Sequence, residues 1–209
     1  MSGRLFTIGH SNHELEHFIG LLKQHAVEAV VDVRSHPSSQ YATHFDSLLL
    51  KPALEAAGIK YAFLGHELGG RPPGDEFYDD QGYVLYDKAA RRPEFLLGIR
   101  RLENAVGRMR LAIMCSEEDP TECHRRLLVG RVLVREGIGV DHIRGDGRIQ
   151  TEEELTGEER RGDGQLSLFP EPEGDTEWKS TRSVSPKRRP SASSKASSRP
   201  ASADFWTSA

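Results

Sequence analysis

The chain is poor in cysteine and in long apolar runs. It has 2 cysteines in 209 residues, too few for a disulfide framework, and this favours a reducing compartment. No apolar stretch approaches the roughly 20 residues needed to cross a bilayer. The first residues also lack the apolar stretch of a signal peptide. We therefore expect a cytoplasmic protein with no membrane segment.

The small net charge of −4 conceals an asymmetry along the chain. Residues 176–209 carry seven Lys or Arg against two acidic residues, a net charge of +5, so the rest of the chain carries −9. This tail is rich in Ser, Pro, Lys and Arg and has few large apolar residues, which predicts disorder. A basic tail often contacts DNA loosely, although a solvated tail without a partner fits the composition equally well.

Composition and patterning divide the chain into three parts. We expect an α/β domain over residues 1–155, a flexible linker over 156–175 and the disordered basic tail over 176–209. Within the domain, strand patterns at residues 5–8, 29–33, 59–64, 111–114 and 141–143 alternate with helical patterns. A capping box at residues 11–14 predicts the start of the first helix. The alternation predicts a mostly parallel sheet with helices on both faces.

Unusual polar residues follow four of these strands. Because the carboxyl ends of parallel strands share one edge of a sheet, we expect these residues to meet in one crevice. Residues suited to nucleophilic or acid–base catalysis are Cys123, His10, Asp32 and Glu117. Residues suited to binding a substrate or anion are Ser11, Arg34, Glu67 and Arg125.

Simpler interpretations stand beside these roles. His10 can brace the first helix, and Asp32 can form a structural ion pair with Arg34, since both lie on one face of a strand. Cys115 ends an apolar strand and fits an inert buried thiol. Cys123 instead lies in a polar run at a helix start, where the pKa of a thiol is usually lowered.

A divalent metal is a further candidate, with ligands among Cys115, Cys123, His124 and His10. The spacing matches no standard zinc pattern. Cys123 and His124 are also adjacent, and neighbours on a helix point in different directions, which weighs against both binding one ion.

The motifs together resemble a bacterial family catalogued as domain of unknown function 488, DUF488. The resemblance covers about residues 6–143, and the matching segments are 7–12, 31–34 with Pro37, 58–59 with Tyr61, 64–65, 67–70, 114–115 with Glu117, 123–125 and 142–143. It supports the domain and the site, but it implies no established reaction.

A separate motif lies in the linker. The residues Gln165, Leu166, Ser167, Leu168 and Phe169 resemble the pentapeptide that bacterial replication and repair proteins use to dock on the DNA polymerase sliding clamp. In such a peptide the Leu and Phe side chains enter an apolar pocket, while the Gln forms hydrogen bonds at the other end. An apolar patch that folds back on the domain is the alternative.

We therefore expect a protein of DNA repair or replication-associated DNA processing that is docked on the sliding clamp. Its domain would be an enzyme acting on a nucleic acid or nucleotide. The alternatives are a non-catalytic adaptor that binds a ligand or partner, and a thiol- or metal-dependent enzyme of small-molecule metabolism. The acidic domain disfavours broad coating of duplex DNA, so any DNA contact should be local or helped by the tail.

Overall fold

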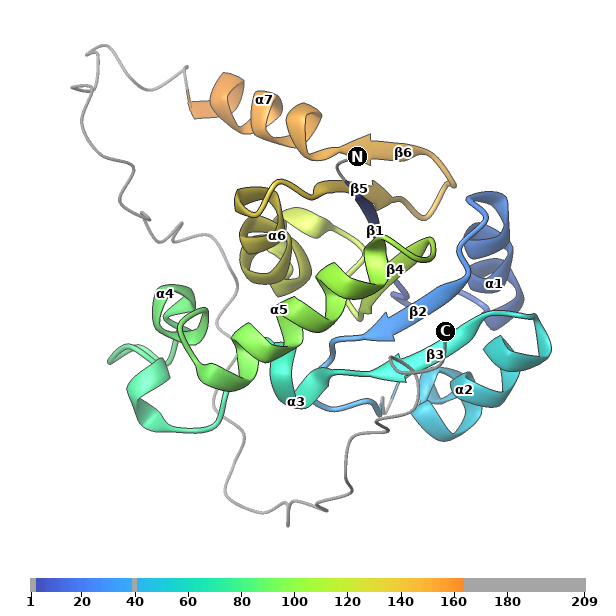
Figure 1. The fold of residues 1–209 in the computed structure, drawn as a ribbon, viewed down its shortest axis with the longest axis horizontal. Coiled ribbons are helices and arrows are strands. Elements are labelled where there is room, and N and C mark those ends of the chain that lie inside the picture. The colour runs from blue at the N-terminus through green and yellow to red at the C-terminus, as the bar shows by residue number, and fades with distance from the viewer. Residues whose placement is uncertain (1–2, 39–40, 164–209) are drawn as a thin grey trace.

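The computed structural model describes residues 3–38 and 41–163, which build an α/β fold around one sheet (Figure 1). The sheet has six strands in the order β3-β2-β4-β1-β5-β6. All neighbouring strands are parallel except β5 and β6. The strands are β1 (Arg4–Gly9), β2 (Ala29–Asp32), β3 (Lys60–Phe63), β4 (Leu111–Cys115), β5 (Gly139–Ile143) and β6 (Ile149–Thr151). The predicted mostly parallel sheet is confirmed.

Helices cover both faces of this sheet. One face of the sheet, which we call the α1 face, packs against α1 and α2, and its core includes Phe18, Leu50 and Ile8. The opposite face, which we call the α5 face, packs against α5, α6 and a π-helical segment, η4. The helices are α1 (Leu15–Gln24), α2 (Ser47–Ala56), α3 (Gly65–Leu68), α4 (Tyr86–Ala89), α5 (Pro93–Val106), α6 (Arg131–Arg135) and α7 (Glu152–Asp163). Short helical segments are η1 (Thr43–Phe45), η2 (Asp75–Phe77), η3 (Pro120–Glu122) and η4 (Arg125–Gly130).

The central strands are buried on both sides, so apolar and polar residues do not alternate along them. Every residue of β2 and of β4 is buried. Side chains of a strand point alternately to the two faces, and accordingly Leu111 and Ile113 join the α5-face core while Ala112 and Met114 join the α1-face core. These continuous apolar runs made the strands visible in the sequence.

Several local expectations were wrong. The capping box does not form, because Glu14 is the residue that precedes α1 and it makes no side-chain cap, while Ser11 has a positive φ of 47°. The sequence pattern also gives no sign of the short helix α3, which follows β3. The helix expected after Cys123 begins as the π-helix η4 and continues as α6.

The last two elements, β6 and α7, were not predicted from the sequence. Helix α7 lies beside β5 and β6 at one edge of the sheet (Figure 1). It continues to Asp163, past residue 155 where we placed the end of the domain. The clamp-like residues 165–169 and the basic tail lie outside the described residues. Among those that are described, no helix is long and apolar enough to cross a membrane.

A buried arginine anchors α7. The side chain of Arg126 is 1% exposed, and its Nε donates to both carboxylate oxygens of Glu152, at 3.0 and 2.9 Å. Its two terminal nitrogens donate to the carboxylate of Glu159, at 2.5 and 3.0 Å. Glu152 and Glu159 lie seven residues apart, about two helical turns, so they face the same side of α7.

Replacing Arg126 by Ala should therefore release α7 from η4. We expect the free energy of unfolding to fall by about 3 kcal/mol, because Glu152 would lose its arginine partner in a largely buried setting. Urea unfolding and protease cleavage within α7 would measure this change. Arg148→Ala removes an exposed pair with Asp146 and should change stability by less than about 1 kcal/mol. Equal effects of the two substitutions would contradict the anchoring role of Arg126.

Candidate functional site

The candidate site lies where two central strands end. After β1 the chain continues into α1, on one face of the sheet, whereas after β4 it continues into η4, on the other face. The loops after these neighbouring strands therefore diverge, and such switch points are the usual ligand sites of open α/β sheets. Here the backbone N–H of His10 donates to the carbonyl of Cys115 at 2.9 Å, and that of Ser11 donates to Ser116 at 2.8 Å.

Most of the predicted site residues lie near this edge, but on opposite faces of the sheet. Cys115, Cys123 and His124 lie on the α5 face, in or beside its core. His10, Asp32 and Arg34 lie on the α1 face, around Phe45. The structure therefore builds two buried polar clusters rather than a single crevice. We call them the thiol cluster (Cys115, Cys123 and His124) and the arginine cluster (Arg34, Asp32, His10 and Tyr61).

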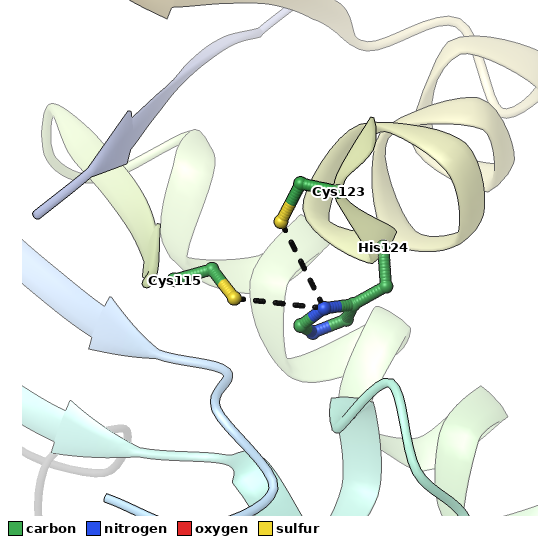
Figure 2. A group of neighbouring side chains, drawn as sticks. All are labelled: Cys115, Cys123 and His124. Carbon is green, nitrogen blue, oxygen red and sulfur yellow. Dashed lines mark hydrogen bonds between the residues drawn. The ribbon is translucent and has the colours of Figure 1, made fainter. Parts of the chain in front are cut away.

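The thiol cluster is compact and buried. The three side chains point toward one another from the end of β4 and from the residues just before η4 (Figure 2). Nδ1 of His124 lies 3.6 Å from Sγ of Cys115 and 3.9 Å from Sγ of Cys123. The exposed fractions of Cys115, Cys123 and His124 are 3%, 0% and 2%. All three side chains are therefore buried.

Cys123 and His124 converge because they are not consecutive residues of one helix. Cys123 is extended, with φ −116° and ψ 137°, whereas His124 already has helical angles of −59° and −23°. The backbone turns between the two residues, and both side chains reach the same point. The sequence-based objection to their sharing one ion assumed that both were helical, and it does not hold.

The imidazole of His124 is held in one tautomer. Its Nε2 lies 2.9 Å from the carbonyl oxygen of Val33. A carbonyl only accepts hydrogen bonds, so Nε2 carries the proton and Nδ1 presents its lone pair to the two sulfurs. On the other side, Gly70 leaves room for the ring, because a Cβ there would lie 2.5 Å from Cγ of His124.

Electrostatics favour a thiolate at Cys123. Burial alone raises the pKa of a thiol. At Cys123 a hydrogen bond from Cys115 and the positive charge of Arg125 act against burial, and the pKa lies well below its usual value. The arrangement can therefore support thiolate chemistry or metal coordination.

The arginine cluster is an internally bonded network. Arg34 donates from Nη2 to Asp32 at 2.6 Å and to the carbonyl of Phe45 at 2.8 Å, and from Nε to Asp32 at 2.9 Å. Tyr61 adds a hydroxyl hydrogen bond to Asp32 at 2.9 Å. Arg34 and Asp32 are 3% and 0% exposed. The structural ion pair considered for these two residues is present, and an anion at Arg34 would have to compete with it.

His10 is a neutral member of this network. Its Nδ1 lies 2.7 Å from the carbonyl of Ser11, so Nδ1 carries the proton, and Nε2 accepts from Arg34 at 3.2 Å. The ring also stacks on Phe45. Burial and then the charge of Arg34 lower the pKa of His10 to about 4. His10 lies apart from the thiol cluster, and both of its nitrogens have partners.

Arg125 shapes the loop that follows β4. It is fully buried, and it donates to Oγ1 of Thr7 at 3.2 Å and to the carbonyls of Glu117 and Glu118, the latter at 2.6 Å. This contact uses the backbone of Glu117, whose side chain is exposed. Arg125 thus binds the protein's own carbonyls at the position where we expected it to bind a substrate anion.

The two remaining predicted residues are placed differently. The hydroxyl of Ser11 is at the edge beside Asn12, 3.3 Å from its side-chain oxygen. Glu67 is turned toward α5, where Oε1 accepts from Arg101 at 2.9 Å. Its Oε2 is buried without a hydrogen-bond partner among the described residues.

Three contributors to the site were not foreseen. They are the carbonyl of Val33, the close approach of Gly70 and the hydroxyl of Tyr61. A backbone carbonyl leaves no trace in a sequence. The Gly69–Gly70 pair is visible in the sequence, but a glycine does not reveal which side chain packs against it.

Comparison with known proteins identifies the family. A family model described as "Domain of unknown function DUF488" matches residues 14–132. This span is more than half of the 209 residues, so the chain belongs to the DUF488 family. No curated protein and no solved structure matches the chain. The family resemblance is therefore confirmed, and its description assigns no reaction.

Asp32→Asn tests whether the arginine cluster is structural. The substitution removes the carboxylate charge that neutralises buried Arg34, so we expect the free energy of unfolding to fall by about 3–5 kcal/mol. Urea unfolding would measure the loss, with the exposed Asp146→Asn as the matched control. An Asp32→Asn protein as stable as the wild type would leave a catalytic role as the better explanation for this carboxylate.

The low pKa of His10 should appear in the pH dependence of stability. The unfolded chain binds this proton near pH 6.5 and the folded protein only near 4. The stabilisation is thus complete above pH 6.5 and lost as pH falls through 4, by at most about 3 kcal/mol. Between pH 7.5 and 4, the free energy of unfolding should fall less steeply for His10→Gln than for the wild type or for His36→Gln. Denaturant unfolding at each pH would measure it. Parallel curves would contradict this burial effect.

Proposed function

We propose that this protein acts in DNA repair or replication-associated DNA processing while docked on the bacterial sliding clamp. Residues 165–169 would be the docking peptide. The α/β domain would be an enzyme that acts on a nucleic acid or nucleotide. The observation that carries the proposal is the match of all five residues, from Gln165 to Phe169, to the clamp-binding pentapeptide.

The position of this peptide supports docking. Helix α7 ends at Asp163, and Gln165 is only two residues further along the chain. Because Arg126 anchors α7 to η4, the peptide would leave the domain from a fixed point. The Gly164 before it and the Pro170 after it are residues that break regular structure.

The charge distribution supports contact with DNA through the tail. Residues 176–209 carry +5 while the remainder carries −9. A negatively charged domain repels the phosphate backbone, so docking on a protein ring and a basic tail would together bring it to DNA.

The thiol cluster is the proposed reactive centre. It lies at the switch point of the sheet, and Cys123 has a lowered pKa. His124 presents an unprotonated nitrogen to both sulfurs. The predicted anion-binding residues Arg34 and Arg125 face inward, so substrate phosphate would be recognised by other groups at this edge.

The second candidate function is a non-catalytic adaptor. It is favoured by the same inward-facing arginines, which make the edge of the sheet a rigid and internally satisfied structure. An adaptor would keep clamp docking and lack any activity that depends on the thiol cluster. Loss of a nuclease, glycosylase or nucleotide-hydrolysing activity on Cys123→Ser, with clamp binding retained, would exclude it.

Docking can be tested with the full-length chain. Replacing Leu168 and Phe169 by Ala removes the two side chains expected to fill the apolar pocket, so binding to a purified bacterial clamp should be lost. For the wild type we expect a Kd on the order of micromolar, because a loose segment must be ordered on binding. Calorimetry would measure both affinities, with circular dichroism to confirm the fold.

The matched control replaces Leu48 and Leu49 by Ala. These leucines are exposed on α2, at 82% and 55%, and lie in the domain. Their replacement should leave the affinity for the clamp unchanged. If the wild-type chain and a peptide spanning residues 163–170 both fail to bind clamps, the docking proposal is wrong.

A further inference from the structure

The geometry points to a zinc site at Cys115, Cys123 and His124. Their three ligand atoms lie within 4.8 Å of one another. Thiolate sulfur and imidazole nitrogen are the ligands that Zn²⁺ prefers, whereas Mg²⁺ and Ca²⁺ prefer oxygen. Zinc would be the cofactor of the proposed reactive centre. Only the use of the ion in catalysis rests on the proposed function.

The spacing of the ligand atoms suits a tetrahedral ion. Usual zinc bond lengths place a sulfur and a nitrogen ligand about 3.5 Å apart, and two sulfur ligands about 3.8 Å apart. The observed distances from Nδ1 of His124 are 3.6 Å to Cys115 and 3.9 Å to Cys123. Small side-chain movements would therefore complete the coordination.

The orientation of His124 is that of a metal ligand. Metal-binding histidines usually donate their second ring N–H to a carboxylate or a backbone carbonyl, which fixes the tautomer and the ring direction. In this protein Nε2 donates to Val33 and Nδ1 faces the sulfurs. One nitrogen lone pair facing two sulfurs satisfies hydrogen bonding only in part, whereas a zinc ion would bind all three atoms.

Charge neutrality explains how such a cluster tolerates complete burial. When both cysteines bind as thiolates, the protons still held by the thiols pass to solvent, and the two negative charges cancel the charge of Zn²⁺. A buried group of charges is costly unless its members are paired. The neutral cluster would tie the end of β4 to the residues before η4, on the α5 face.

The ligand count leaves one coordination position open. No other Cys, His, Asp or Glu of the part of the chain that the structure describes joins the group. Structural zinc sites usually have four protein ligands, whereas catalytic sites have three and keep the fourth position for water or substrate. The site therefore has the ligand count of a catalytic centre in which zinc activates water or polarises a substrate oxygen.

The first experiment measures zinc in the full-length wild-type protein, prepared without a His tag. We expect about one zinc per chain by mass spectrometry of the metal. Both thiols should resist a thiol reagent in the native protein until a chelator is added. Replacement with Co²⁺ should give the visible absorption of a tetrahedral site and a thiolate-to-metal band in the near ultraviolet.

Variants then test the named ligands. Cys123→Ser and His124→Asn should lose the zinc, while His36→Asn, an exposed histidine, should keep it. Gly70→Ala should displace the ring of His124 and weaken zinc binding about 10–100-fold, the usual effect of disturbing the groups that orient a ligand. Gly20→Ala is its matched control, since a Cβ there meets nothing within 4 Å.

The wild-type protein alone can overturn the inference, even if the ligand variants fail to fold. A folded protein that holds no zinc after incubation with zinc and dialysis contradicts it. So does a disulfide between Cys115 and Cys123 in the native protein. Clamp binding is measured separately, so a failed zinc site and failed docking are distinguishable.

Discussion

Buried guanidinium groups hold the loops at the carboxyl edge of the sheet, and both clusters depend on them. Arg34 joins the end of β2 to His10 and to the carbonyl of Phe45. On the other face, Arg125 fixes the carbonyls of Glu117 and Glu118 and thereby the loop that leads to Cys123. Each arginine supplies a rigid fork of donors to acceptors that would otherwise be buried without partners. The edge is therefore rigid before any ligand binds.

Most of the fold could be predicted because its strands are short apolar runs separated by helical patterns. The exceptions have physical reasons. Residues 152–163 contain only one large apolar residue, Leu155, so the sequence shows no helical periodicity of apolar residues that would predict α7. That helix is held by ion pairs from Arg126, a residue 26 positions before Glu152. Interactions between distant residues of this kind leave no local signal.

The edge that carries the site could be predicted, but the division into two clusters could not. Strand ends place Cys115 and Asp32 together, because parallel strands share an edge. Which face each side chain takes depends on the register and on the helices that cover each face. The bond from His124 to Val33 spans 91 positions. The position of the His124 side chain also depends on the change from extended to helical backbone between Cys123 and His124, which the pattern of residues did not reveal.

The central position of β1 also affects how the chain must fold during synthesis. Strand β1 is the first to leave the ribosome, yet its two neighbours, β4 and β5, begin at Leu111 and Gly139. Its apolar residues, Leu5 to Ile8, have no strand to pair with until most of the domain has been made. Such distant pairings slow folding and expose apolar strand edges in the meantime. The nascent chain therefore carries an unpaired apolar strand until β4 emerges.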